Sequence, residues 1–215
     1  MGGLMRSRFA MLSIVLGFTL SACGGDGADE PLDATRVCGE LFSGQAAKSL
    51  EKLTGATAFE HTVTDGLSKT EQFLKSDYRK RLNWSRSSST LCVVAREGGG
   101  HSIRMNFDVY APWDVTDEHH PMGVEAYRVG KKAWAGVTRS DVYFECVSTK
   151  LEGSSARPLR VHASIRMSKA RTPDSREYRE AYLTVLHSAS LKLAKKMECE
   201  NSGGLPDPLV LQPVA

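Results

Sequence analysis

The sequence has no hydrophobic run long enough to cross a membrane as a helix. Its most apolar stretch extends from Phe9 to Ala22, whereas a transmembrane helix needs roughly 20 apolar residues. The stretch follows Arg6 and Arg8 and ends in small residues, which is the pattern of a secretory signal peptide. We therefore expect residues 1–22 to direct export and to be cleaved off.

An excess of one charge is also missing. The chain carries 28 lysine and arginine residues against 25 aspartate and glutamate residues, and loss of Arg6 and Arg8 with the signal peptide leaves 26 against 25. Proteins that bind nucleic acid normally carry a clustered basic excess. The near neutrality of the mature chain therefore argues against nucleic acid as a partner.

Several catalytic motifs are absent from the sequence. Without a Cys-x-x-Cys pair there is no thioredoxin-type redox site and no zinc ribbon. Without a Gly-x-Ser-x-Gly segment there is no nucleophile elbow of the serine hydrolases. The glycine clusters at 24–27 and 98–100 do not lead from a strand into a helix, so neither is expected to cradle a phosphate. We expect no cofactor and assign no catalytic residue.

One of the five cysteines stands where the apolar stretch ends. The segment Leu20-Ser21-Ala22-Cys23 resembles the lipobox of bacterial lipoproteins. The resemblance implies lipidation of the Cys23 sulfur, cleavage after Ala22 and a place on the extracytoplasmic face of the cell membrane. Two or three acyl chains on one cysteine make a durable anchor, since a single chain binds only marginally. An ordinary secretory signal cut after Ser21 or Ala22 is the alternative.

The remaining cysteines are Cys38, Cys92, Cys146 and Cys199. An even number in an exported chain indicates two disulfides, with free structural thiols as the alternative. A helix with a cysteine precedes a cysteine-bearing hairpin in the first half, and the order is mirrored in the second. We therefore prefer Cys38 with Cys92 and Cys146 with Cys199, while two other connectivities remain open.

The chain divides into four regions by composition. After the signal peptide, residues 23–34 are polar and glycine-rich and are expected to form a flexible tether that buries nothing. Residues 35–200 are enough for a single domain. The proline- and glycine-rich residues 201–215 are expected to lie loose or extended on the surface.

Alternating apolar residues predict two β-hairpins in the domain. The first pairs 91–96 with 103–109 across the glycine turn, and the second pairs 142–147 with 161–167. Shorter extended pieces are expected near 125–129 and 133–137. The sequence Ser-Ile-Arg-Met occurs at 102–105 and again at 164–167, a faint internal repeat.

Helical periodicity marks three further segments. One helix should follow Ser43 and close at Gly55, and a second should begin at Ser68, which forms a capping box with Glu71. A long helix should run from the Thr172-Pro173 cap to Cys199. Hairpins with amphipathic helices and no βαβ alternation predict an α+β fold in which the helices pack on an antiparallel sheet.

The domain also bears a looser resemblance to a family. The segment VCGELFSGQAAKSLEKLTGA, together with a last helix ending in Glu-Cys, resembles small four-cysteine lipoproteins of high-GC Gram-positive bacteria. The resemblance implies a fold and a location, and no catalytic residue is carried over.

A few residue groups are candidates for chemistry or binding. Asp117, Glu118, His119 and His120 are potential divalent-metal ligands, but adjacent residues rarely converge on one ion and no third ligand is indicated by spacing, so no metal is assigned. His187 lies inside the long helix, either as a base or as a surface or core-edge residue. Trp84, Trp113 and Trp134 either line a ligand cleft or pack in the core. The densest basic patch either contacts anionic lipid headgroups or wall polymers, or is a solvated helix face with the loop that follows. It consists of Lys75, Arg79, Lys80, Arg81 and Arg86.

Two function hypotheses follow from these features. The first is a membrane-anchored, non-catalytic binding or accessory module whose partner is an envelope protein or a small ligand. The second is a cell-envelope hydrolase, metal-dependent or not, that uses the loop with His119 and His120.

Overall fold

The computed structural model describes residues 31–62, 65–116, 123–169 and 174–214. The expected signal peptide and Cys23 lie outside the described residues, as do His119, His120, Thr172 and Pro173.

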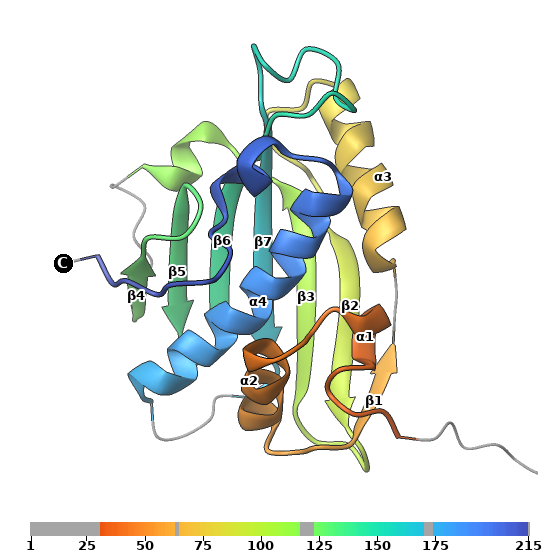
Figure 1. Cartoon of the computed structure of the whole chain (residues 1–215), viewed down its shortest axis with the longest axis vertical. Helices are drawn as coiled ribbons and strands as arrows, with labels where there is room; N and C mark the ends of the chain where they lie inside the picture. Colours follow the sequence, from red (N-terminus) through yellow and green to blue (C-terminus); the bar gives the residue numbers. More distant parts are fainter. Residues whose placement is uncertain (1–30, 63–64, 117–122, 170–173, 215) are drawn as a thin grey trace, which may run out of the picture. The chain divides into compact units, whose positions relative to one another are not determined.

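One antiparallel sheet of seven strands organises the domain, in the order β1-β2-β3-β7-β6-β5-β4 (Figure 1). The strands are β1 (Phe59–Thr62), β2 (Ser89–Arg96), β3 (Ser102–Val109), β4 (Val124–Tyr127), β5 (Lys132–Gly136), β6 (Arg139–Cys146) and β7 (Leu159–Met167). Both predicted hairpins are present, as β2 with β3 and β6 with β7. The two shorter extended pieces are β4 and β5, and the expected α+β class is confirmed.

The helices gather on one face of this sheet, with α4 crossing it diagonally (Figure 1). The helical elements are α1 (Val37–Glu40), α2 (Gln45–Thr54), α3 (Gly66–Arg79), α4 (Arg176–Lys196) and the 3-10 turns η1 (Pro112–Val115) and η2 (Glu200–Gly204). Their apolar side chains share one core with the inward residues of the strands, such as Met105, Phe144 and Ile165. None of the helices in the described ranges is long and apolar enough to span a membrane.

Two of the predicted helix starts are wrong. The helix α3 begins at Gly66, two residues before Ser68, so the expected capping box with Glu71 does not form. Contact with β2 fixes this start instead, because the Asp65 N–H donates to the Thr90 carbonyl oxygen at 3.0 Å and its carboxylate accepts from Ser89. The cap of α4 is Ser175, whose hydroxyl accepts from the Tyr178 N–H at 3.3 Å. Helix α2 has the expected bounds, with Gly55 as a left-handed cap.

The two Ser-Ile-Arg-Met segments lie side by side at the centre of the sheet. They belong to β3 and β7, where Ile103 pairs with Met167, Arg104 with Arg166 and Met105 with Ile165. The repeat therefore marks the middle of the fold, with one cysteine-bearing hairpin strand on each side of it.

Two disulfides fasten helical segments to the strands beneath them. Cys38 of α1 is bonded to Cys92 of β2, and Cys146 of β6 is bonded to Cys199, which follows α4. This is the pairing preferred from the sequence. Each bond closes a loop of similar length, with sequence separations of 54 and 53 residues.

The terminal segments of the domain pair with part of each edge of the sheet. Leu32 exchanges two backbone hydrogen bonds with Phe59 of β1, and the stretch around Pro213 is hydrogen-bonded to β4. The prediction that residues 31–34 belong to a flexible tether is therefore wrong. Ala34 is buried, because the pairing of Leu32 with the sheet edge brings this stretch into the core. The expectation that residues 201–215 lie loose or extended on the surface holds only in part: Gly203 and Leu205 are buried, and the stretch around Pro213 is tied to the sheet edge.

Gly130, in the turn between β4 and β5, has no room for a side chain. Its φ is +61°, and an added Cβ would lie 2.4 Å from the Tyr143 carbonyl oxygen. We expect Gly130→Ala to lower the free energy of unfolding by about 2 to 3 kcal/mol, because left-handed strain and a backbone clash add together. Urea denaturation measures the loss.

Gly39 provides the matched control. Its φ of +70° and ψ of +45° lie in the left-handed region, but nothing lies within 4 Å of an added Cβ. Gly39→Ala should therefore carry the conformational penalty alone, about 1 kcal/mol. Equal losses at the two positions would contradict the predicted clash.

Candidate functional site

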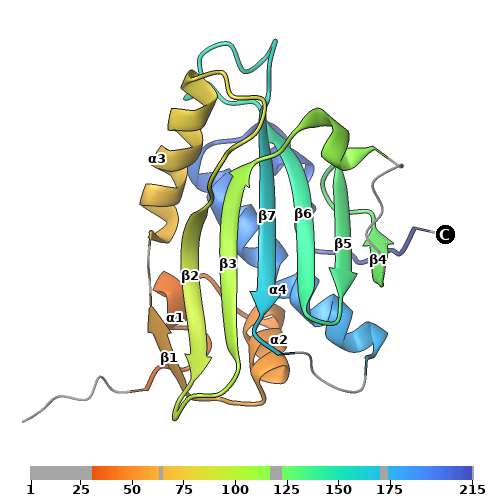
Figure 2. The same ribbon diagram turned by 180° about the vertical axis from the view of Figure 1, so that it is seen from behind.

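The helices leave the other face of the sheet uncovered. In the described ranges no α-helix packs on this face, and in the view of Figure 2 the strands β2, β3, β7, β6 and β5 lie in front of α4 and α2. Side chains alternate across a strand, so the residues between the core positions point outward. We call this surface the open face, and it carries Arg104, Asp108, Tyr143, Asp141, His162 and Arg166.

A histidine flanked by two carboxylates lies at the centre of the open face. The strand register places His162 of β7 directly between Asp108 of β3 and Tyr143 of β6. The Nδ1 atom of His162 is 3.2 Å from Asp108 Oδ1, and the Nε2 atom is 2.9 Å from Asp141 Oδ1. Asp141 also accepts a hydrogen bond from Arg166 Nη2 at 2.8 Å. The four side chains form a charge cluster with two acids and two bases.

The geometry keeps the His162 ring protonated. Burial on its own would lower the pKa of the ring, but hydrogen bonds to Asp108 and Asp141 outweigh burial and raise the pKa to about 9. Each ring nitrogen faces a carboxylate oxygen, so both carry a proton and donate it. An imidazolium without a free lone pair cannot accept a proton, and His162 is therefore not suited to act as a general base at neutral pH.

An aromatic group packs against this charge cluster. The Tyr143 ring stacks on the His162 ring, with centroids 4.6 Å apart and planes 17° apart. Tyr110 and Trp134 meet Tyr143 edge to face at 5.3 Å and 5.2 Å. Burial, and next the Asp141 charge, raise the pKa of Tyr143, so its hydroxyl stays neutral. The group makes a second, small apolar cluster on the open face, separate from the main core.

A hollow of about 570 Å³ adjoins the charge cluster at the end of β3. One wall is the connection between α3 and β2, which carries Trp84, and the other is η1, which carries Trp113. In the view of Figure 2 these two segments lie on either side of the upper end of β3. Asp108 lines the hollow as well as bonding His162, so the hollow and the charge cluster share a residue.

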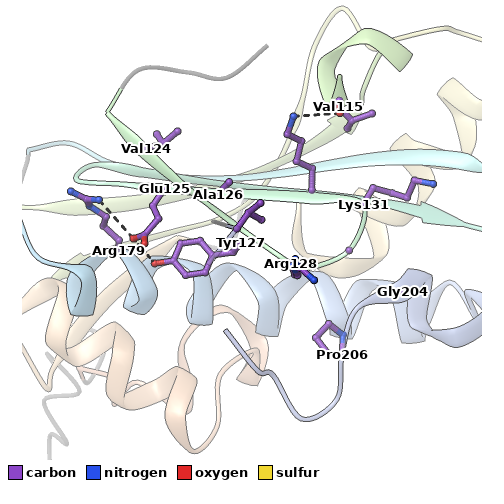
Figure 3. Close-up of a pocket in the computed structure, with 13 residues that line it drawn as sticks. Val115, Val124, Glu125, Ala126, Tyr127, Arg128, Lys131, Arg179, Gly204 and Pro206 are labelled. Carbon is purple, nitrogen blue, oxygen red and sulfur yellow. Dashed lines mark hydrogen bonds and ion pairs between the residues drawn. The ribbon is translucent and has the colours of Figure 1, made fainter. Parts of the chain in front are cut away.

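A larger hollow of about 930 Å³ surrounds the edge strand β4 (Figure 3). Its lining residues point to opposite sides of the strand, with Val124 on one side and Glu125 and Tyr127 on the other (Figure 3). Two of its cations already bind acids, Arg179 with Asp174 and Glu125, and Lys131 with Glu145. The hollow is thus the surface around a sheet edge, and we do not take it as the site.

The structure places the three tryptophans and His187, for which the sequence left a functional and a structural role open. Trp84 and Trp113 are 49% and 52% exposed and line the hollow, whereas Trp134 is buried in the aromatic group. His187 is a buried residue beneath the C-terminal segment, and burial lowers its pKa. It takes no part in the open face.

The basic patch is only partly neutralised. Lys75 binds Glu71 at 2.6 Å, and Lys80 lies 3.8 Å from Asp77. Within the described residues no ion pair involves Arg79, Arg81 or Arg86, and Arg86 lines the hollow beside Trp84.

No metal centre is indicated in the part of the chain that the structure describes. Among these residues, no group of three or more histidine, cysteine, aspartate and glutamate side chains could hold a metal ion. His119 and His120, the candidates from the sequence, fall outside this part.

Sequence reasoning missed the charge cluster. Asp108 and His162 occupy outward positions of predicted strands, so alternation alone could have placed them on a polar face, whereas Asp141 lies one residue before the predicted start of β6. Their meeting depends on the strand order β3-β7-β6, which brings Asp108 next to a residue 54 positions later. Comparison of the chain with protein-family models, curated proteins and solved structures found no match.

Proposed function

We propose that this chain is a membrane-anchored extracytoplasmic lipoprotein that acts as a non-catalytic binding module of the cell envelope. Cys23 carries the lipid, and the open face recognises the ligand. The observation that carries this proposal is the uncovered side of the sheet, where aromatic and charged side chains surround a hollow. A face without helices that is rich in tyrosine, tryptophan and arginine has the composition of recognition surfaces.

The disulfides support a location outside the cytoplasm. Disulfides persist in oxidising compartments and are rare in the cytosol, and all four cysteines of the domain are paired. The chain from Cys23 to Pro31 spans at most about 30 Å when extended. An anchored domain would therefore stay close to the membrane surface.

The charge cluster supports binding rather than catalysis. Both ring nitrogens of His162 are occupied by carboxylates, and Asp141 already accepts hydrogen bonds from His162 and Arg166. These hydrogen bonds hold the side chains of the charge cluster in fixed positions. Preorganised side chains lower the entropy lost when a ligand binds.

The anchor is tested by replacing Cys23 with serine in the full chain. We expect the wild-type protein to be found in the membrane fraction and to incorporate labelled fatty acid, and Cys23→Ser to incorporate none. The serine hydroxyl is a poor substitute for the thiolate as the nucleophile that receives the diacylglyceryl group. Labelling of the serine variant, or an unlabelled wild-type chain, would remove the anchor from the proposal.

Ligand recognition is tested with one substitution on the open face and one on the helical side of the domain. Arg104 is exposed on the open face, and Lys48 is exposed on α2. Co-sedimentation of the full chain with purified envelope material should be weakened severalfold by Arg104→Glu, because a charge reversed at a binding surface disfavours association. Lys48→Glu should leave it unchanged. Equal effects of both variants, or no sedimentation of the wild type, would count against the open face.

A further inference from the structure

The hollow at the end of β3 holds two tryptophans that folding does not bury. Trp84 is 49% exposed and Trp113 is 52% exposed, and both line the same hollow. An exposed indole ring keeps apolar surface in contact with water, which is unfavourable. Two such rings on neighbouring segments therefore offer a ligand apolar surface that a single, scattered tryptophan would not.

The walls between the tryptophans carry polar groups of both signs. Asp108 and Asp114 supply carboxylates and Arg86 supplies a guanidinium group. Asp114 accepts a hydrogen bond from the Ala111 N–H at 2.8 Å through Oδ2. Its other oxygen adds to the acceptors of the hollow. Ser87 and Ser88 add hydroxyls that both donate and accept.

These groups do not all match an ion of one sign. An anion would meet the two carboxylates, and a cation would meet the Arg86 guanidinium. A neutral ligand that carries many hydroxyls satisfies both, because each hydroxyl donates to a carboxylate and accepts from arginine. Its carbon skeleton must also present a flat apolar face to the indole rings.

A pyranose ring meets all of these requirements, since it has apolar C–H faces and a rim of hydroxyls. We propose that the hollow between Trp84 and Trp113 binds a neutral carbohydrate. The sugar stacks on the indole rings, and its hydroxyls bond Asp108, Asp114 and Arg86. The volume of about 570 Å³ lies within the range of roughly 300 to 1,000 Å³ found for ligand pockets. This inference rests on the proposed binding function and names its ligand class.

The test uses the purified full chain and four neutral tetrasaccharides, built from glucose, N-acetylglucosamine, mannose and galactose. Isothermal titration calorimetry and tryptophan fluorescence measure binding. We expect at least one tetrasaccharide to bind and to change the emission of the exposed indoles. Trp84→Ala and Trp113→Ala should each weaken that binding by at least about tenfold, the size of effect seen when a central aromatic contact is removed.

Two controls separate the site from general effects. Val210→Ala removes another exposed apolar side chain, 55% exposed, outside the hollow and should leave affinity unchanged. Trp84→Tyr keeps a flat ring and should restore part of the affinity that Trp84→Ala loses. Thermal unfolding of each variant confirms that the fold is retained, which is expected because both tryptophans are exposed.

Three results would overturn the carbohydrate site. They are absence of binding for all four tetrasaccharides up to about 10 mM, binding that neither tryptophan substitution weakens, and tryptophan-dependent binding of tetramethylammonium or acetate in place of the sugars. If envelope material still binds through the open face in any of these cases, only the carbohydrate inference fails. If envelope binding is also absent, the proposed function fails with it.

Discussion

Replacing Asp141 with asparagine is expected to lower the free energy of unfolding by about 3 kcal/mol. Asp141 is only 4% exposed and accepts hydrogen bonds from both His162 and Arg166. When its charge is removed, the buried His162 and the half-buried Arg166 are left with a single carboxylate, that of Asp108. Removing one partner of a buried ion pair typically costs about 3 to 5 kcal/mol. Asparagine has nearly the shape of aspartate, so no cavity adds to the loss. Urea denaturation at pH 6 measures it.

The same cluster should make stability depend on pH. The pKa of His162 is about 9 in the folded chain and 6.5 in the unfolded chain, so between these values the folded state binds more protons. The His162 contribution, roughly 3 kcal/mol, is therefore complete below pH 6.5 and disappears as pH rises through 9. Burial on its own would raise the pKa of Asp141, but the hydrogen bond from His162 and the Arg166 charge together lower it, so Asp141 adds stability that is lost only in acid.

Two variants provide the comparison for this cluster. His162→Phe should flatten the decline between pH 6.5 and 9, because no titrating ring remains. Asp108→Asn should have a smaller effect than Asp141→Asn, since the Asp108 side chain is 24% exposed against 5% for Asp141. A wild-type stability that stays constant from pH 6.5 to 9 would show that His162 is not protonated in the folded state.

Removing the disulfide between Cys146 and Cys199 is expected to lower the free energy of unfolding by about 4 kcal/mol. The bond closes a loop with a sequence separation of 53 residues. In the chain-entropy model a loop of this length restricts the unfolded chain by about that amount. The double variant Cys146→Ala with Cys199→Ala avoids a reactive free thiol, and guanidinium denaturation of both proteins gives the difference.

The second disulfide is a matched control for this loss. Cys38 and Cys92 close a loop with a separation of 54 residues, so the entropic model predicts the same loss for Cys38→Ala with Cys92→Ala. If one pair lowers the free energy of unfolding much more than the other, the difference comes from contacts in the folded state rather than from the entropy of the unfolded chain. A loss below about 1 kcal/mol for both pairs would contradict the model.

Local patterns predicted most elements of this fold. The hairpins followed from alternation, α2 followed from the spacing of its buried Ala46, Ala47, Leu50 and Leu53, and the disulfides followed from the mirrored order of helix and hairpin. The start of α3 differs because a tertiary contact replaces a local one, whereas α4 uses a different local cap, Ser175. Asp65, bonded to β2, sets the start of α3 in place of the predicted cap at Ser68.

The site was less accessible to such reasoning. Trp84 and Trp113 are ligand-cleft candidates in the sequence, but nothing there separates them from Trp134, which is buried and meets the Tyr143 ring edge to face at 5.2 Å. The charge cluster needs three strands in one order, and its members are far apart in the chain. Alternation gives the face of a residue, and only the strand order gives its neighbours.

The paired parts of the sheet edges restrict how this domain can recognise a protein. Many modules bind an extended peptide by adding it as a further strand, which requires free backbone N–H and C=O groups along an edge strand. Here Leu32 occupies such groups of Phe59, and Gln212 and Val214 occupy those of Arg128 and Ala126. Pro213, which lies beside the edge strand β4 opposite Tyr127, has no N–H to offer to a further strand. At these positions a peptide that binds by main-chain pairing would first have to displace one of the chain's own ends, which favours recognition through side chains.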